Sequence, residues 1–428
     1  MLSRRTMIAS AAVLAAGCGP LGSFFSAPSA PQGAELTWVS LGNHLGLSDL
    51  TGNGMRPVEK LQRAVTTLEE DNENPNGQKR GKYHLTLRHV EKTSELGEET
   101  FVDWLHDLDA DLVNVSPEGA RALGEEGVLL PLDQFIATDG AALEQAFYPS
   151  VLEQFRQEEL YALPVDARPL MLYYDADYFA LEEVSPPVDG NWDWSDLVEN
   201  ALRLTKRRED GSVSRWGLEA HGSRLWWALW QNEAEAVYPA TLQCRLQESA
   251  AIEALQFVHS LLHTLRVSPA ALYMDLAKLV FEPARFAPAI VYSSPPIRPP
   301  GHCHLAELPR GKVHSVPVYG DMGIGIVART ENPQATYTAL KGIVDALQEH
   351  VVVTAKRDPI ARLEETRSDL HPEDVLAIQR SMEHGRAWPR SVPALFAMDS
   401  ALQGIVHGDE VASVVNEACA VAREYQQA

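Results

Sequence analysis

Positive charge is scarce in this sequence. Its 428 residues include 36 Lys and Arg against 59 Asp and Glu, which gives a formal charge of -23 at pH 7. Such an acidic chain cannot neutralise a phosphate backbone, so no nucleic acid is expected as a partner. The same charge argues against adsorption to an anionic lipid surface. It leaves open membrane attachment by another route.

Cysteine is also scarce, with four residues in the whole chain. Cys244, Cys303 and Cys419 are too few and too widely spaced for a disulfide framework, and they allow at most one bridge with a leftover thiol. The sequence leaves open whether any two of them pair. His302, Cys303 and His304 would alternate faces in an extended segment and cannot all converge on one ion, so no metal is expected.

Familiar catalytic motifs are missing as well. Gly323-Ile324-Gly325 lacks the third glycine and the following helix of a dinucleotide fingerprint, so no cofactor is expected. There is no Gly-x-Ser-x-Gly elbow, phosphate-binding loop or zinc-helix motif. Paired carboxylates are always findable among 59 acidic residues, so their presence decides nothing. No internal repeat is visible, which excludes solenoids and propellers.

The N-terminus reads as an export signal. Arg4 and Arg5 precede an apolar stretch at residues 7–16 that is too short to span a bilayer. Residues 3–8 resemble a twin-arginine signal, although the choice between the two export routes stays open. An ordinary buried helix is the alternative interpretation.

A lipid anchor is predicted next to this signal. Residues 14–18 read Leu-Ala-Ala-Gly-Cys and resemble a bacterial lipobox, which implies that Cys18 is lipidated and becomes the mature N-terminus. We expect a signal peptide at residues 1–17 and a flexible tether, rich in Pro, Ser, Gly and Ala, at residues 18–34. Losing Arg4 and Arg5 takes the formal charge from -23 to -25.

Strands and helices alternate along the body of the chain, which indicates an α/β fold with a largely parallel sheet. The predicted strands are residues 35–40, 83–90, 110–115, 128–132, 160–165, 170–174, 289–292 and 323–327. The predicted helices are residues 57–68, 100–108, 117–126, 195–206, 225–232, 249–264, 270–280 and most of the chain from residue 333.

A series of landmarks follows in a recognisable order. They are Asp-Leu-Val-Asn-Val at 111–115, Leu-Gly-Glu-Glu-Gly-Val-Leu-Leu-Pro-Leu-Asp at 123–133, Tyr-Ala-Leu-Pro-Val-Asp at 161–166, Leu-Tyr-Tyr-Asp-Ala-Asp-Tyr-Phe at 172–179 and Trp-Asp-Trp-Ser-Asp-Leu at 192–197. Residues 254–257, 267–269 and 405–408 continue the series. Together they resemble the bacterial extracellular solute-binding proteins of ABC importers, in the carbohydrate-binding group.

This resemblance implies a two-lobe α/β fold of the periplasmic-binding-protein type II. Each lobe is a mixed or parallel sheet flanked by helices, and the ligand cleft lies at the hinge. Lobe 1 would comprise residues 35–164 and 315–360, and lobe 2 residues 165–314 and 361–428.

The implied protein is a lipid-anchored, extracytoplasmic monomer of the bacterial cell envelope. It would capture a sugar or sugar-like solute and deliver it to the permease subunits of an ABC importer, without being an enzyme. An orphan or sensory binding protein of the same fold and a secreted carbohydrate-active enzyme are the alternatives. The sequence names neither the ligand nor the membrane.

One segment departs from the family. Where the family has Gly-Arg-Ala-Ala-Met before a strand ending in Gly-x-Trp, residues 281–294 end in Tyr292, Ser293 and Ser294. The family's aromatic ligand contact therefore does not carry over to this position, and the three residues take its place as candidates.

Aromatic faces and paired hydrogen-bonding groups are what a sugar requires of its site. The residues that the resemblance brings to the cleft are Asn43, His44, Ser116, Glu118, Asp166, Arg168, Trp226, Tyr292, Ser293, Tyr319, Asp321 and Trp388.

Several of these candidates have a simpler alternative. Ser116 is positioned to cap the helix that follows it. Asp166 and Arg168 would form an ion pair at the hinge, although the planar fork of Arg168 also suits an anionic ligand. Trp226 shares a helix face with Trp230 and is equally compatible with a place in the core.

Overall fold

The computed structural model describes residues 34–41, 57–71, 83–90, 103, 105, 109–139, 142–219, 225–270, 288–292, 303–348, 350–351, 353–367 and 370–426. The predicted signal, Cys18, the tether, Asn43, His44 and Ser293 lie outside these residues. Tyr292 is described only in its backbone. No described helix is long and apolar enough to cross a membrane.

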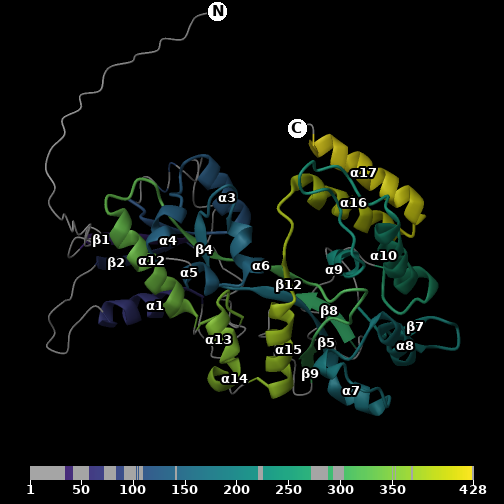
Figure 1. Ribbon diagram of the computed structural model, residues 1–428. Helices are drawn as coiled ribbons and strands as arrows, with labels where there is room; N and C mark the ends of the chain where they lie inside the picture. Colours follow the sequence, from purple (N-terminus) through teal and green to yellow (C-terminus); the bar gives the residue numbers. More distant parts are fainter. Residues whose placement is uncertain are drawn as a thin grey trace, which may run out of the picture.

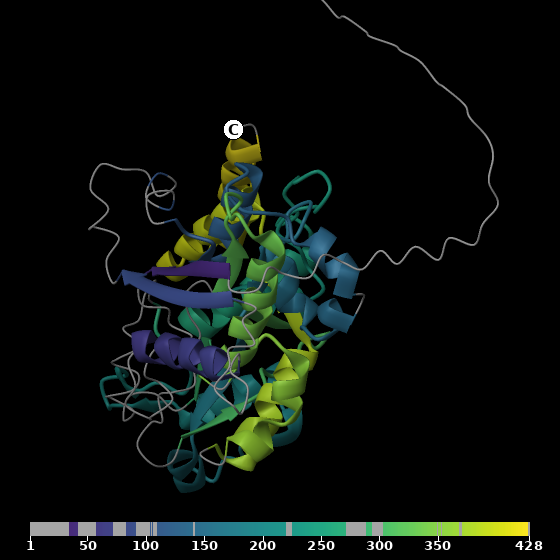
Figure 2. The same ribbon diagram turned by 90° about the vertical axis from the view of Figure 1, so that its left-hand side faces the viewer.

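The first sheet has the strand order β2-β1-β3-β11-β4. Its strands are β1 (Ala34–Leu41), β2 (Tyr83–Val90), β3 (Leu112–Val115), β4 (Ala162–Pro164) and β11 (Gly323–Ile326). β1 runs parallel to both of its neighbours, whereas β11 is antiparallel to β3 and β4. Helices α1 and α12 pack against each other beside β2 (Figure 2).

The second sheet has the order β12-β10-β5-β8, and β9 also pairs with β5. Its strands are β5 (Arg168–Asp175), β8 (Pro288–Tyr292), β9 (Cys303–Ala306), β10 (Val316–Tyr319) and β12 (Gly385–Ala387). β10 is parallel to β12 and antiparallel to β5. A separate hairpin joins β6 (Lys206–Arg207) to β7 (Val213–Arg215).

Helices surround both sheets (Figure 1). In the first half they are α1 (Pro57–Asp71), α3 (Pro117–Glu125), α4 (Asp133–Asp139), α5 (Ala142–Gln145), α6 (Pro149–Leu152), the 3-10 turn η4 (Glu153–Phe155) and α12 (Pro333–Leu347). The others are α7 (Ala176–Leu181), η5 (Val188–Gly190), α8 (Trp194–Leu204), α9 (Leu225–Gln231), α10 (Ser249–His259), the π-helical turn η6 (Ser260–Thr264), α13 (Arg357–Ala361), α14 (Leu363–Thr366), α15 (Pro372–Glu383), α16 (Val392–His407) and α17 (Val411–Gln426).

Two hydrophobic clusters give the molecule the two halves seen in Figure 1. The first is built on the first sheet, with Trp38 and Ile324 fully buried, and it reaches β10 through Val318. The second contains Trp227 and Leu261 and is closed by the antiparallel pair α16 and α17. Burial of separate apolar surfaces in this way is what makes each half compact on its own.

The chain passes between the two sheets at neighbouring places. β4 leads to β5 through residues 165–167, and β10 leads to β11 through residues 320–322. A third segment lies beside the first, because Ala167 N donates to Val353 O at 2.9 Å and Ala355 N donates to Val165 O at 3.2 Å. The expected lobe boundaries stay a prediction, but these three segments are where a hinge between the halves would lie.

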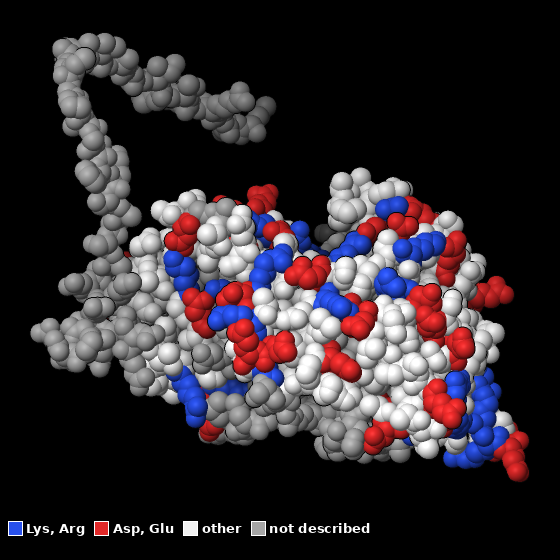
Figure 3. Space-filling model, turned by 60° about the horizontal axis from the view of Figure 1, so that its bottom comes forward, with Lys and Arg blue, Asp and Glu red and all other residues white. Residues whose placement is uncertain are grey.

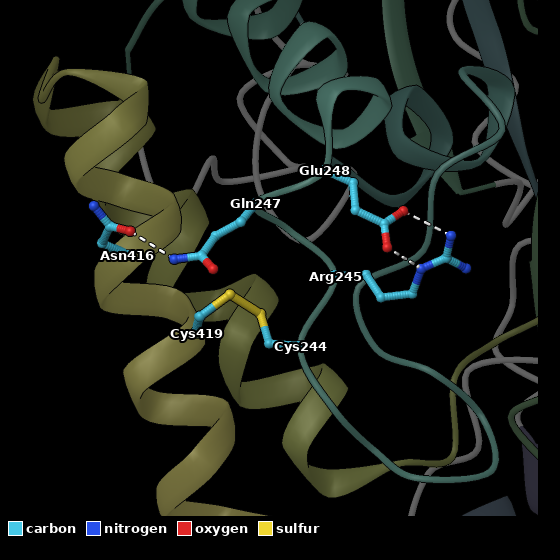
Figure 4. The surroundings of a disulfide bond; sticks show 6 residues. All are labelled: Cys244, Arg245, Gln247, Glu248, Asn416 and Cys419. Atoms are coloured by element: carbon cyan, nitrogen blue, oxygen red, sulfur yellow. Dashed lines mark hydrogen bonds and ion pairs between the residues drawn. A yellow bond between two sulfur atoms is a disulfide. The ribbon is translucent and has the colours of Figure 1, made fainter.

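A disulfide ties the second half together (Figure 4). Cys244, in the loop before α10, is bonded to Cys419 of α17, with their Cα atoms 5.3 Å apart. Beside it, Gln247 Nε2 donates to Asn416 Oδ1 at 2.7 Å and joins the same two segments. One bridge was the maximum that the sequence allowed, and Cys303 on β9 is the cysteine left over.

The predicted elements differ from the observed ones in a few places. Residues 128–132 were expected to form a strand, but only Leu129 makes a bridge, to Val327. Pro131 has no N–H to donate and α4 begins two residues later, so a ladder cannot continue there. The short strands β9, β10 and β12 were not predicted. Their three or four residues carry too little alternation to stand out from the surrounding loops.

Candidate functional site

The surface is hollowed between the two halves of the molecule (Figure 3). Lys, Arg, Asp and Glu side chains are interspersed over the face shown, so charge of one sign does not dominate it. In the ribbon view, α3 belongs to one half and α16 to the other (Figure 1). Three groups of side chains come together around the crossing segments.

The first group is an ion triad on two crossing segments. Arg168 Nη2 donates to Asp321 Oδ2 at 2.7 Å, and Arg168 Nε lies 3.5 Å from Asp166 Oδ2. The other oxygen of Asp166 accepts backbone hydrogen bonds from Asp321 at 3.1 Å and Met322 at 2.9 Å. These contacts bring together segments 153 residues apart in the chain. The structure therefore contains the hinge ion pair that the sequence offered as one interpretation of Asp166 and Arg168.

Burial sets the electrostatics of this triad. Asp166 is 2% exposed and Arg168 is 8% exposed, so neither charge is well hydrated. Desolvation raises the pKa of Asp166 to about 6, with Asp321 adding to the rise, while Arg168 and the two backbone donors oppose it. Two carboxylates surround Arg168, so its charge is already balanced within the protein.

The second group is a row of four aromatic rings. Tyr319, at the end of β10, contacts Trp388 edge to face with the ring centroids 6.2 Å apart. Trp388 meets Trp226 in the same way at 6.0 Å, and Trp226 lies 5.3 Å from Trp230. Trp226 and Trp230 are buried, whereas Tyr319 and Trp388 are half-buried. The row thus runs from the crossing segments into the second half, and its accessible end is at Tyr319 and Trp388.

The inner end of the row carries a charge pair. The guanidinium of Arg386 lies 4.3 Å from the ring centre of Trp230 and forms an ion pair with Glu235. The indole N–H of Trp230 is buried and has no hydrogen-bond partner among the described residues. Trp227, the neighbour of Trp226, points elsewhere and packs edge to face on Trp194 at 5.7 Å, in the second hydrophobic cluster.

The third group comes from the N-terminal turns of α3. Ser116 accepts a hydrogen bond from Gly119 N at 3.1 Å and caps this helix, as its simpler interpretation predicted. Glu118 is exposed in the first turn, and its charge reaches the Tyr319 phenol. Burial raises the pKa of Tyr319, and Glu118 and Asp321 add to that rise. One further side chain of α3, Arg121, donates to Gln154 O.

Most of the predicted site residues with described side chains do come together. Asp166, Arg168 and Asp321 form one cluster, and Trp226, Tyr319 and Trp388 form the other. Tyr292 ends β8 and pairs with Leu170 of β5 in the backbone register. Ser116 is occupied by its helix cap. Whether any of these residues contacts a ligand stays a prediction.

The arrangement matches known architectures. Residues 106–246 match the family model described as bacterial extracellular solute-binding protein. A cyclic alpha-maltosyl-1,6-maltose binding protein from Arthrobacter globiformis superposes with a TM-score of 0.68 at 14% identity, covering 92% of this chain and 98% of that one. The fold is that of the solute-binding proteins.

Two further solute-binding structures cover the same share of this chain. The maltose/maltodextrin-binding domain from Bdellovibrio bacteriovorus, bound to maltotriose, has a TM-score of 0.62 at 17% identity and is covered to 100%. An ABC transporter solute-binding protein from Agrobacterium radiobacter, in complex with ribitol, has a TM-score of 0.62 at 18% identity and is covered to 99%. The predicted two-lobe α/β solute-binding fold is therefore confirmed over most of the chain.

Sequence reasoning missed several residues of this solute-binding fold's central region. Gln154 holds the crossing segment that follows β10, since its Nε2 donates to Val318 O at 3.0 Å and its Oε1 accepts from Gly320 N at 3.3 Å. Arg121 and Arg390 were also missed. Arg390 stands two residues after Trp388 in the sequence, and that proximity to a candidate aromatic residue was the available signal.

Proposed function

We propose that this protein is a lipid-anchored, extracytoplasmic receptor that captures a sugar or sugar-like solute between its two halves and hands it to the permease of an ABC importer. The single observation that carries the proposal is the row Tyr319–Trp388–Trp226–Trp230, whose accessible end lies at the crossing segments beside Asp321. Aromatic faces cover the C–H faces of a sugar, and carboxylates accept hydrogen bonds from its hydroxyls.

Two further considerations support a sugar-like ligand. Among solute-binding structures of the same fold, one is bound to maltotriose, one is in complex with ribitol, and one is a cyclic alpha-maltosyl-1,6-maltose binding protein. In addition, the half-buried Trp388 and Tyr319 meet edge to face, which leaves ring surface available to a ligand. Closure of the two halves about the crossing segments would then bury the ligand.

A thermal-shift screen tests the ligand class. The panel comprises neutral sugars, acidic sugars, polyols and glycerol phosphates, because a ligand that binds only the native state raises its melting temperature. At least one saccharide or polyol is expected to raise the Tm in a concentration-dependent way. A flat response to every saccharide and polyol would refute the proposal.

The anchor and the permease need tests of their own. Cys18→Ser in the full-length precursor should abolish incorporation of a radiolabelled fatty acid and release the protein from the membrane fraction. Cys303→Ser is the matched control and should leave both unchanged. For the permease, neighbouring genes encoding two permease subunits would support the importer, whereas their absence would favour an orphan or sensory receptor.

A further inference from the structure

Two arginines from different parts of the chain lie at the same end of a short helical segment. Arg121 of α3 donates to Gln154 O. Arg390, in the loop between β12 and α16, donates to Glu153 O at 3.1 Å and also to Arg156 O. The carbonyl groups that accept these hydrogen bonds therefore belong to Glu153, Gln154 and Arg156, within four consecutive residues.

The position of this pair connects it with the aromatic row. Arg390 follows Trp388 by two residues, and Trp388 N donates to Val318 O of β10 at 3.1 Å. Gln154, whose backbone carbonyl accepts from Arg121, donates its side-chain Nε2 to the same Val318 O at 3.0 Å, one residue before Tyr319. The pair thus lies by Tyr319 and Trp388, at the accessible end of the row and not at its buried end.

Neither guanidinium forms an ion pair with a carboxylate in the part of the chain that the structure describes. Burial lowers the pKa of Arg121, Glu118 opposes this, and the positive charge of Arg390 adds to the lowering. Arg168, by contrast, is balanced by Asp166 and Asp321. Arg121 therefore has acidic neighbours on its own helix, Glu118 and Glu125, but no described carboxylate within ion-pair distance, and Arg390 brings a second positive charge to the same stretch of carbonyl groups.

We propose that Arg121 and Arg390 receive an anionic group of the bound solute, so that the ligand is an acidic sugar carrying a carboxylate or a phosphate. This inference rests on the proposed function and deepens it. The backbone carbonyls hold one or two donors of each guanidinium, and the planar fork leaves other N–H groups free for carboxylate or phosphate oxygens. Trp388 and Tyr319 would meanwhile cover the sugar ring.

Equilibrium calorimetry on matched ligands tests this inference. Each neutral sugar is paired with its uronate and its sugar phosphate, and the proteins are the wild type, Arg121→Gln and Arg390→Gln. Arg207→Gln is the matched control, since Arg207 also donates to two backbone carbonyls, of Leu265 and Arg266, but belongs to the β6–β7 hairpin. The Tm of every variant without ligand reports whether it folds.

The expected result is tighter binding of one acidic member than of its neutral partner. Charged hydrogen bonds predict a loss of about tenfold or more for that member in Arg121→Gln and in Arg390→Gln. Neutral sugars and Arg207→Gln should be unaffected, and added salt should weaken only the acidic ligand. Preference for the uronate or for the phosphate identifies the source of the anionic group.

Failure of this inference is distinguishable from failure of the proposed function. If neutral sugars bind and no acidic partner binds more tightly, or if both variants lose neutral and acidic ligands equally, the inference is wrong and the sugar receptor stands. If no saccharide binds, inorganic phosphate serves as the probe. A rise in Tm with phosphate that both variants abolish would retain the anion site without a sugar, and no rise would overturn it.

Discussion

Arg168 donates a 2.7 Å hydrogen bond to Asp321 and thereby joins the two segments that connect the sheets. Removing Arg168 would leave the buried Asp166 and the half-buried Asp321 without the cation that they share. Arg168→Ala should therefore lower the free energy of unfolding by about 3–5 kcal/mol, as measured by urea denaturation.

The control for that prediction is an exposed ion pair. Arg203 lies 3.6 Å from Glu183, with side chains 49% and 87% exposed. Arg203→Ala should cost less than about 1 kcal/mol. An equal effect of the two substitutions would contradict the assigned role of Arg168.

The raised pKa of Asp166 predicts that the free energy of unfolding depends on pH. In the folded protein this carboxyl holds its proton up to about pH 6, whereas its ordinary pKa is 3.8. Folding therefore takes up a proton between these values, so this group makes the free energy of unfolding fall as pH rises from 4 to 6. Asp166→Asn keeps an oxygen to accept the backbone hydrogen bonds but removes the titration.

Urea titrations at several pH values test this directly. The wild type minus Asp166→Asn difference in the free energy of unfolding should decrease from pH 4 to pH 6 and be constant above pH 7. A difference that is independent of pH, or that increases over this range, would show that Asp166 is already ionised at pH 4.

The disulfide predicts a sensitivity to reductant. Cys244 and Cys419 are separated by 175 residues, so the bridge restricts a long loop of the unfolded chain. The double substitution Cys244→Ser and Cys419→Ser should cost about 2–4 kcal/mol of unfolding free energy. Reductant should destabilise the wild type and Cys303→Ser alike and leave the double variant unchanged. Peptide mapping that found Cys303 in the bridge would refute the pairing.

Trp388 is expected to contact the ligand most directly among the three tryptophans of the row, because it is half-buried while Trp226 and Trp230 are buried. Trp388→Ala should weaken saccharide binding by about tenfold, in line with the value of an aromatic contact beyond its area. Phe396→Ala is the matched control, since Phe396 is 43% exposed and stacks on Tyr425 at 4.0 Å. Equal affinities for the two variants would remove Trp388 from the site.

Strands and helices with a long, regular hydrophobic pattern were predicted well from the sequence. The strand at residues 83–90 was predicted with its observed bounds, and the helix at residues 117–126 differs by one residue. Landmarks in order also predicted the two-lobe fold. Short strands such as β12 depend on pairing with β10, which is a tertiary contact that no local pattern reveals.

The candidate site was predicted less completely. Asp166 and Arg168 were identified because they lie at the expected lobe crossing, and Asp321 because the resemblance brings the loop before the glycine strand to the cleft. Their mutual neutralisation was only partly foreseen, because it depends on a contact between distant segments. Arg121 gave no local signal, since arginines on helices are common, and the signal for Arg390 was its place two residues after Trp388. Their significance comes from the shared carbonyl groups at residues 153–156.

Calorimetric titration of the purified mature protein with a saccharide panel decides whether this protein is a sugar receptor. At least one saccharide should bind with a stoichiometry of one, be recovered unmodified, and lose affinity in Trp388→Ala but not in Phe396→Ala. Absence of binding across the panel would refute the sugar receptor, as would release of a processed product with turnover.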